Sequence, residues 1–108
     1  MLPKNRILPH PGEILRHEFM EPMGLTGNAL ALGLSVPGNR VTAIVNGERA
    51  ISADTALRLA CYFGTTAEFW INMQAGHDLS KARAEIWRNL QCEYPVVEGI
   101  ERHDFTTF

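Results

Sequence analysis

Residues 35–47, SVPGNRVTAIVNG, decide the fold that this sequence predicts. Proline near the start and glycine at the end match the asymmetry of helix ends, so the stretch predicts a helix over residues 37–46. Val41, Ile44 and Val45 share one side of this helix and form a narrow apolar stripe. Because so short a helix is unstable alone in water, the stripe must pack on the rest of a domain.

The outward face of this helix is unusual for a solvated surface. It carries small residues, flat amides, a hydroxyl and one guanidinium, namely Gly38, Asn39, Arg40, Thr42, Ala43 and Asn46, with Pro37 at its start. Glycine and asparagine are poor helix formers, and a purely structural helix would gain from Glu, Lys or Ala at such positions. The alternative is an ordinary surface helix with a solvated polar face. The composition favours a functional face.

A second short helix is predicted directly before the first. Thr26 is a good N-cap for a helix over residues 27–34, in which Leu30 and Leu34 share one face. A tight turn at residues 35–36 joins the two helices, which is the arrangement of a helix-turn-helix. In that motif the second helix lies in the major groove of DNA. Short helix pairs are also common in all-α domains, so a purely structural pair stays open as an alternative.

The side chains of the outward face suit the edges of base pairs. Arg40 can donate two hydrogen bonds to guanine, and Asn39 or Asn46 can pair with adenine. Thr42 can bond to a base or pack its methyl group on thymine. The start of the helix would then read sequence directly.

Other positions suit the phosphate backbone. Gly38 has no side chain, so the helix start can approach a phosphate and offer it backbone N–H groups. Arg49 lies just beyond the helix and is placed for another phosphate contact. Lys4 and Arg6 belong to a proline-punctuated N-terminal arm and would help to fix the register on phosphates.

The flanking sequence predicts further helices. Pro11 begins a helix over residues 11–21, which Pro22 ends, with Leu15 and Phe19 facing inward. Ser52 and Gly64 bracket a helix over residues 53–63, and Asp54 suits its positive N-terminal end. This helix is apolar over most of its circumference (Ala53, Ala56, Leu57, Leu59, Ala60, Cys61, Phe63) and is predicted to be the central core helix, with Cys61 as a small core residue.

The sequence after residue 64 predicts two separate helices. Thr65 and Glu68 form a capping box at the start of a fifth helix, in which Phe69 and Trp70 supply core surface. A further amphipathic helix is predicted over residues 79–90, because Leu79, Ala82, Ile86 and Leu90 fall on one stripe with Trp87 nearby. This stripe can pack on its own domain, pair with a second copy or contact another protein. Residues 93–108 are predicted to be a loosely held tail.

Composition narrows the class of protein. The chain of 108 residues, 45% of them hydrophobic, can bury the core of one domain. No segment alternates with period two, so the predicted class is all-α. No apolar stretch is long enough for a membrane span or a signal peptide, and we expect a soluble cytoplasmic protein. Two cysteines, Cys61 and Cys92, are too few for a disulfide framework.

The charge and the scattered polar residues bear on partners and chemistry. DNA-binding proteins are usually basic, whereas this chain has a net charge of −2, which suggests an acidic face that suits a basic protein partner. The histidines lack metal-ligand spacing and are expected to be surface or capping residues. No nucleophile and base pair is apparent, so we expect neither an enzyme nor a cofactor.

Several longer segments are specific to one family. The run VNGERAISADTALRLACYFGTTAEFWINMQAGHDL at residues 45–79 closely resembles the HigA/VapI-type antitoxins, a branch of the lambda-repressor-like helix-turn-helix family. HPGEILRHEFMEPMGL at residues 10–25 is similar to the first segment of that branch, and VPGNRV at residues 36–41 also agrees. The resemblance covers about residues 9–80.

The resemblance implies a fold, partners and site residues. The expected fold is a five-helix domain over residues 10–79 with an N-terminal arm (residues 1–9) and a C-terminal helix and tail (residues 80–108). It implies a homodimer that binds double-stranded operator DNA, represses its own operon and neutralises a small basic RNA-cleaving toxin of the RelE/HigB-like kind. Residues 37–42 match the start of the recognition helix, while Thr26 and Asn28 match the phosphate-facing start of the preceding helix.

Two positions depart from the family pattern and keep alternatives open. Gly27 stands where the family often has a glutamine that bonds a phosphate, and Ser35 stands where it often has glycine. These changes are expected to weaken operator binding without altering the fold. There are two alternative functions. The chain could be a helix-turn-helix regulator without a toxin, or an interaction module that has lost DNA binding.

Overall fold

The computed structural model describes residues 6–90, which contain helices and no strand. A short helix, α1 (Pro11–Ile14), continues into a π-helical stretch, η1 (Leu15–Met20). The following helices are α2 (Gly27–Leu34), α3 (Gly38–Val45), α4 (Ala53–Phe63) and α5 (Ala67–Leu90). The all-α class is confirmed, and the predictions on Lys4, Cys92 and the tail lie outside the described residues.

Local signals at the helix ends act as the sequence predicted. The Thr26 hydroxyl accepts a hydrogen bond from the N–H of Ala29 at 3.1 Å and caps α2. The Ser52 hydroxyl accepts one from the N–H of Thr55 at 3.3 Å and caps α4. Gly64 ends α4 in the left-handed conformation, with φ 75°. The bounds of α2 and α4 therefore match the prediction.

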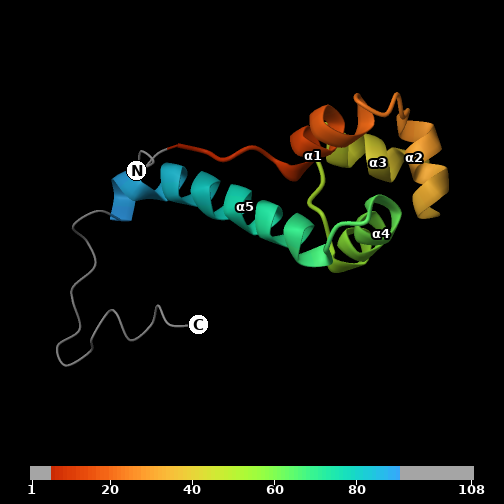
Figure 1. Ribbon diagram of the computed structural model, residues 1–108. Coiled ribbons are helices and arrows are strands. Elements are labelled where there is room, and N and C mark those ends of the chain that lie inside the picture. The colour runs from red at the N-terminus through yellow and green to blue at the C-terminus, as the bar shows by residue number, and fades with distance from the viewer. Residues whose placement is uncertain (1–5, 91–108) are drawn as a thin grey trace.

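The core lies where α1 to α4 meet the first turns of α5 (Figure 1). Leu30, Leu59 and Trp70 are fully buried in it. Val41 and Ile44 of α3 are buried and Val45 packs against them, which confirms the apolar stripe. The core thus takes one face from each short helix.

The prediction that α4 is the central core helix is wrong. Only Thr55, Ala56 and Leu59 of α4 are buried, whereas Leu57 is 63% exposed. Cys61, predicted to be a core residue, is a free and exposed thiol. The reason is that α4 packs on α2 and α5 with the side that carries Ala56, Leu59 and Phe63. Leu57 and Cys61 lie on the other side and face solvent.

The structure also corrects the start of α5. The capping residue is Thr66, whose hydroxyl accepts a hydrogen bond from the N–H of Phe69 at 3.1 Å. The predicted capping box of Thr65 and Glu68 is therefore wrong. The Thr65 hydroxyl instead accepts a hydrogen bond from Nε1 of the buried Trp70 at 2.7 Å.

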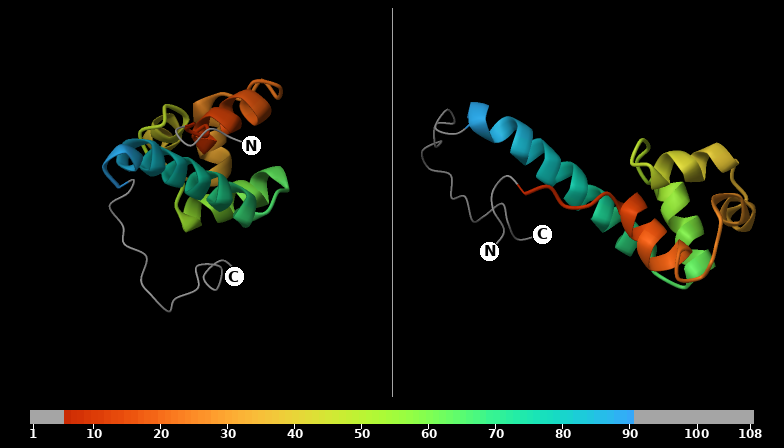
Figure 2. Two further views of the ribbon diagram at one scale, coloured as in Figure 1. Left: turned by 90° about the vertical axis from the view of Figure 1, so that its left-hand side faces the viewer. Right: turned by 90° about the horizontal axis from the view of Figure 1, so that it is seen from above.

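The two helices predicted after residue 64 are one continuous helix. Gly76 does not interrupt α5, because a glycine inside a helix costs only about 1 kcal/mol relative to alanine. The later part of α5 extends away from the other helices (Figure 2). Leu79 and Ile86 of the predicted stripe are 58% and 42% exposed, while the side chains of Trp87 and Leu90 lie outside the description. In the described residues, no helix has the length and apolarity to cross a bilayer.

Candidate nucleic-acid interface

The turn between α2 and α3 sets the direction of α3. Ser35 adopts the left-handed conformation (φ 59°, ψ 46°) at the end of α2, and the N–H of Val36 bonds to the carbonyl of Ala31 at 3.0 Å. Pro37 is extended and acts as the N-cap residue, so α3 begins at Gly38, one residue later than predicted. Serine thus occupies a conformation that glycine adopts more easily.

The buried side of α3 rests directly on α1. A Cβ atom added to Gly12 would overlap the carbonyl oxygen of Ile44. Gly12 therefore allows the two backbones to touch, which a residue with a side chain would prevent. His10 caps α1 beside this contact, because its Nδ1 accepts a hydrogen bond from the N–H of Gly12 at 2.9 Å.

His10 is held in its neutral form. Its Nδ1 carries no proton when it accepts the bond from Gly12. Burial lowers the pKa of His10, and the ring of His77, centred 5.0 Å away, lowers it further. The carboxylates of Asp78 and Glu13 raise the pKa, but the net shift is downward. The prediction of surface or capping histidines holds for His10, which caps α1, and for His17, which is exposed.

The outward side of α3 is polar and largely accessible. Asn39, Thr42 and Asn46 are exposed, whereas Gly38, Arg40 and Ala43 are half-buried. The Thr42 hydroxyl donates a hydrogen bond to the carbonyl of Gly38 at 3.2 Å. This bond occupies the hydroxyl proton, so the methyl group is the simplest outward contact that Thr42 offers.

The starts of α2 and α3 lie side by side. A Cβ atom on Gly38 would lie 3.2 Å from Oδ1 of Asn28, which places this amide against the first turn of α3. Thr26 and Asn28 are both exposed. The structure thus brings together the predicted phosphate-facing residues of α2 and the predicted base-facing residues of α3.

The basic residues predicted to contact phosphates are placed differently. Arg49 is exposed in the segment after α3. Arg6 is exposed on the N-terminal arm, which runs beside α5 and away from α3 (Figure 1). Within one chain, Arg49 therefore adjoins the α3 surface and Arg6 does not.

The partner of Arg40 was not predicted from the sequence. Nη1 of Arg40 is 3.5 Å from Oδ2 of Asp54 in the first turn of α4, so the side chain turns back toward the domain. Asp54 was expected to favour the helix start, and nothing in the spacing pointed to Arg40. In the described range, no group of three or more His, Cys, Asp or Glu residues is placed to hold a metal ion.

The comparisons with known proteins agree with this geometry. A family model described as helix-turn-helix matches residues 17–70. Virulence-associated protein I of Dichelobacter nodosus is 53% identical over 76 residues, which cover 70% of this chain and 70% of that protein. The match of the family model includes the two short helices and the turn between them.

Solved structures extend the similarity to most of the chain. An addiction module antidote protein of the HigA family from Coxiella burnetii has a TM-score of 0.79 at 46% identity, covering 85% of this chain and 100% of that one. Pseudomonas aeruginosa antitoxin HigA, solved with the higBA promoter, has a TM-score of 0.79 at 42% identity, covering 82% of this chain and 97% of that one. The chain therefore belongs to the helix-turn-helix family, in the branch of the HigA antitoxins and virulence-associated protein I.

Proposed function

We propose that this chain is an antitoxin that binds operator DNA in a sequence-specific way and represses its own operon. The observation that carries the proposal is the polar side of α3, where Asn39, Thr42 and Asn46 are exposed while Val41 and Ile44 are buried. A helix anchored in this way can enter a major groove without disturbing the core. The similar Pseudomonas aeruginosa HigA, whose structure contains promoter DNA, supports the proposal.

Different residues of α3 would contact different bases. Asn39, near the helix start, suits adenine, and Arg40 suits guanine. Thr42 offers its methyl group to thymine, because its hydroxyl is bonded to Gly38. Asn46 lies at the end of α3, where Ala43 leaves room for a base edge beside it.

The start of α2 and the segment after α3 would hold the phosphates. The Thr26 hydroxyl accepts the capping bond from Ala29, so its proton remains free to be donated to a phosphate oxygen. Asn28 is exposed and lies beside Gly38, where its amide can donate to a phosphate oxygen. Arg49 adds charge at the other end of α3.

Two copies are proposed to bind together. A two-fold dimer places two α3 helices in successive major grooves, at half-sites about 34 Å apart. The exposed Leu79 and Ile86 of α5 support a contact between chains, because apolar residues on an extended helix gain from being covered.

The second proposed partner is a small basic toxin that cleaves RNA, of the RelE/HigB-like kind. Two observations support it: similar proteins are named as antitoxins, and the net charge of −2 suits a basic partner. Co-expression with a neighbouring small gene tests this. Rescue of growth and co-purification are expected, whereas a regulator without a toxin would give DNA binding alone.

Fluorescence anisotropy with two duplexes tests the DNA-binding proposal. One duplex carries the promoter of the chain's own operon, and the other has the same composition in shuffled order. We expect preference for the promoter and an affinity that falls steeply with salt. Asn39→Ala should weaken promoter binding, while the matched control Asn72→Ala on α5 should not. Equal affinity for both duplexes would leave only non-specific binding.

A further inference from the structure

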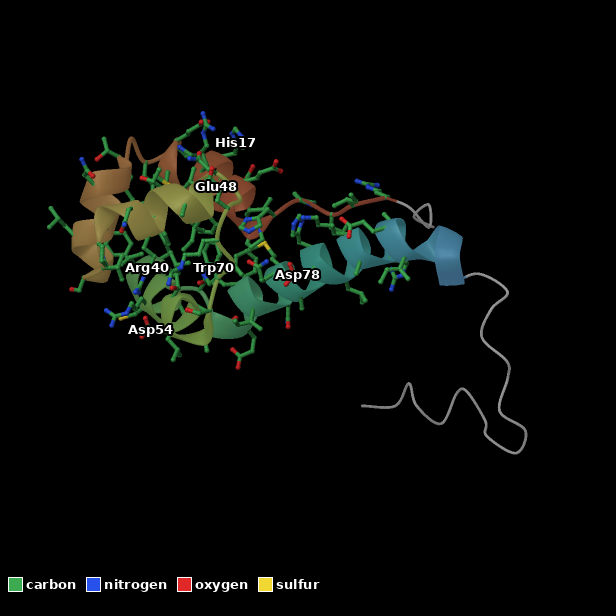
Figure 3. All side chains as sticks on the ribbon, turned by 180° about the vertical axis from the view of Figure 1, so that it is seen from behind. His17, Arg40, Glu48, Asp54, Trp70 and Asp78 are labelled. Carbon is green, nitrogen blue, oxygen red and sulfur yellow. The ribbon has the colours of Figure 1, made fainter. Side chains whose placement is uncertain are left out.

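The guanidinium of Arg40 lies between α3 and the first turn of α4. Its Nη1 is 3.5 Å from Oδ2 of Asp54, and the side chain is 26% exposed. Its Nε is buried, and it has no hydrogen-bond acceptor among residues 6–90. Figure 3 shows Arg40 and Asp54 close to each other at one edge of the domain.

A second arginine fixes the position of Asp54. Nε of Arg58 donates to the same Oδ2 at 2.9 Å, and Nη1 of Arg58 donates to the carbonyl of Leu34 at 2.8 Å. Leu34 is the last residue of α2. The negative charge of Asp54 is thereby held at a defined place relative to the turn between α2 and α3.

The two arginines bind Asp54 with unequal strength. Charge-assisted N–H···O bonds usually measure about 2.7–2.9 Å, so the bond from Arg58 is a strong one and the bond from Arg40 is long. A buried donor without an acceptor is unfavourable, and the Nε of Arg40 is such a donor. The free protein therefore orients Arg40 through one long bond, and the exposed part of the side chain remains available to an acceptor on DNA.

We propose that Asp54 is a positioning residue that sets the DNA specificity of Arg40. Its carboxylate confines the guanidinium to one direction, so that Arg40 meets one base pair rather than any acceptor within reach. A side chain restrained in advance loses less freedom on binding. The fixed negative charge also disfavours pairing of Arg40 with a passing phosphate. This inference rests on the proposed function.

Two simpler roles of Asp54 make different predictions. An acidic residue in the first turn of α4 stabilises that helix, which would leave the choice of DNA unchanged. A negative charge near DNA would weaken binding to every duplex by the same factor. Positioning differs from both, because it changes the ratio of affinities between operator and shuffled DNA, and only while Arg40 is present.

A double-mutant cycle separates these roles. The proteins are wild type, Asp54→Asn, Arg40→Ala and the double variant, each titrated with the operator and with a shuffled duplex. Asparagine keeps an acceptor for Arg58 and removes the charge. We expect Asp54→Asn to lower the affinity ratio at least about fivefold, the lower range for one base contact. In the Arg40→Ala background, the change should stay below about twofold.

The matched control is Asp78→Asn on α5. Asp78 also accepts a hydrogen bond from its own helix, from Nε2 of Gln74 at 2.9 Å, and its loss of charge should leave the ratio unchanged. Thermal unfolding without DNA checks that each variant is folded. If Asp54→Asn is not folded, it is replaced by Asp54→Ser, which keeps a hydrogen-bond acceptor in the first turn of α4.

Three outcomes overturn the inference. If Asp54→Asn leaves the ratio of operator to shuffled-DNA affinity unchanged, the positioning role of Asp54 is rejected and the proposed function is not affected. A ratio that falls equally with and without Arg40 also rejects this role, because the effect then does not pass through that side chain. A wild-type protein without preference for the operator rejects the proposed function and this inference together.

Discussion

The helices α3 and α5 are held in opposite ways. Eight residues form α3, and it is stable only because one side is buried and the Ile44 carbonyl rests on Gly12. By contrast, α5 has 24 residues and continues well beyond the core (Figure 1). A short helix that depends on contacts along one side leaves its other side free for polar groups. A long helix carries its own hydrogen bonds and can expose apolar residues.

The largest expected effect comes from a substitution that breaks the contact beneath α3. Gly12→Ala places a methyl group on the carbonyl oxygen of Ile44, and a backbone cannot rotate away as a side chain can. We expect the free energy of unfolding to fall by at least about 4 kcal/mol, at the upper end of overpacking costs. Urea denaturation followed by circular dichroism measures this.

The same substitution in α5 is the matched control. A methyl group on Gly76 would lie 3.4 Å from Cδ1 of Leu8, an ordinary contact. Gly76→Ala should therefore raise the free energy of unfolding by about 0.5–1 kcal/mol, because alanine favours the helix. Equal losses for both variants would refute the contrast between the two helices.

A pair of isoleucines gives the next largest effect. Ile44 is buried and Ile86 is exposed in the single chain. At concentrations at which the protein is a monomer, Ile44→Ala should therefore cost about 3 kcal/mol in unfolding free energy and Ile86→Ala less than about 0.5 kcal/mol. Chemical denaturation at several protein concentrations checks both. A larger cost for Ile86→Ala that depends on concentration would show that a second copy covers this part of α5.

The two helices should also differ in DNA binding. Arg40→Ala removes a predicted guanine contact and should weaken operator binding by about 1–3 kcal/mol. Arg83 is exposed on α5, and Arg83→Ala should change this affinity by less than about 0.5 kcal/mol. A gel-shift titration at one salt concentration compares them, and equal effects would remove Arg40 from sequence reading.

The smallest expected effect concerns pH. The pKa of His10 lies below 6.5 in the folded protein because of burial and the neighbouring His77. The unfolded chain therefore binds more protons between that lowered pKa and 6.5. Stability should be full above about pH 6.5 and should fall as the pH drops through this window.

The pH effect is tested with two histidine variants. Asparagine at position 10 can still accept the bond from Gly12 and does not titrate, so His10→Asn should flatten this part of the pH profile in urea denaturation. His17 is exposed, and His17→Asn is the control for replacing a histidine by asparagine. An unchanged slope in His10→Asn would assign the pH dependence to other groups.

The sequence predicted those features that neighbouring residues determine. The caps at Thr26 and Ser52 and the end of α4 at Gly64 depend on atoms within one helical turn. The apolar stripe of Val41 and Ile44 follows from helical periodicity. These local signals were enough to locate α2, α3 and the turn between them.

The features that were not predicted depend on distant residues. Cys61 and Leu57 are exposed because no helix among residues 6–90 covers that side of α4. Nothing local distinguishes Thr65 from Thr66 as the cap, and the hydrogen bond from Trp70 decides between them. Arg40 turns toward an acid 14 positions away, and sequence spacing carries no signal for such a pair.

One turn of α5 holds Leu8 through both its backbone N–H and its backbone carbonyl. Its N–H donates to Oγ of Ser80 at 2.9 Å, and its carbonyl accepts from Nδ1 of His77 at 2.8 Å, across 72 and 69 positions of sequence. During synthesis the arm leaves the ribosome first, and its partners Ser80 and His77 follow much later. The arm can therefore be attached only after this part of α5 has been synthesised, which makes its attachment a late step of folding.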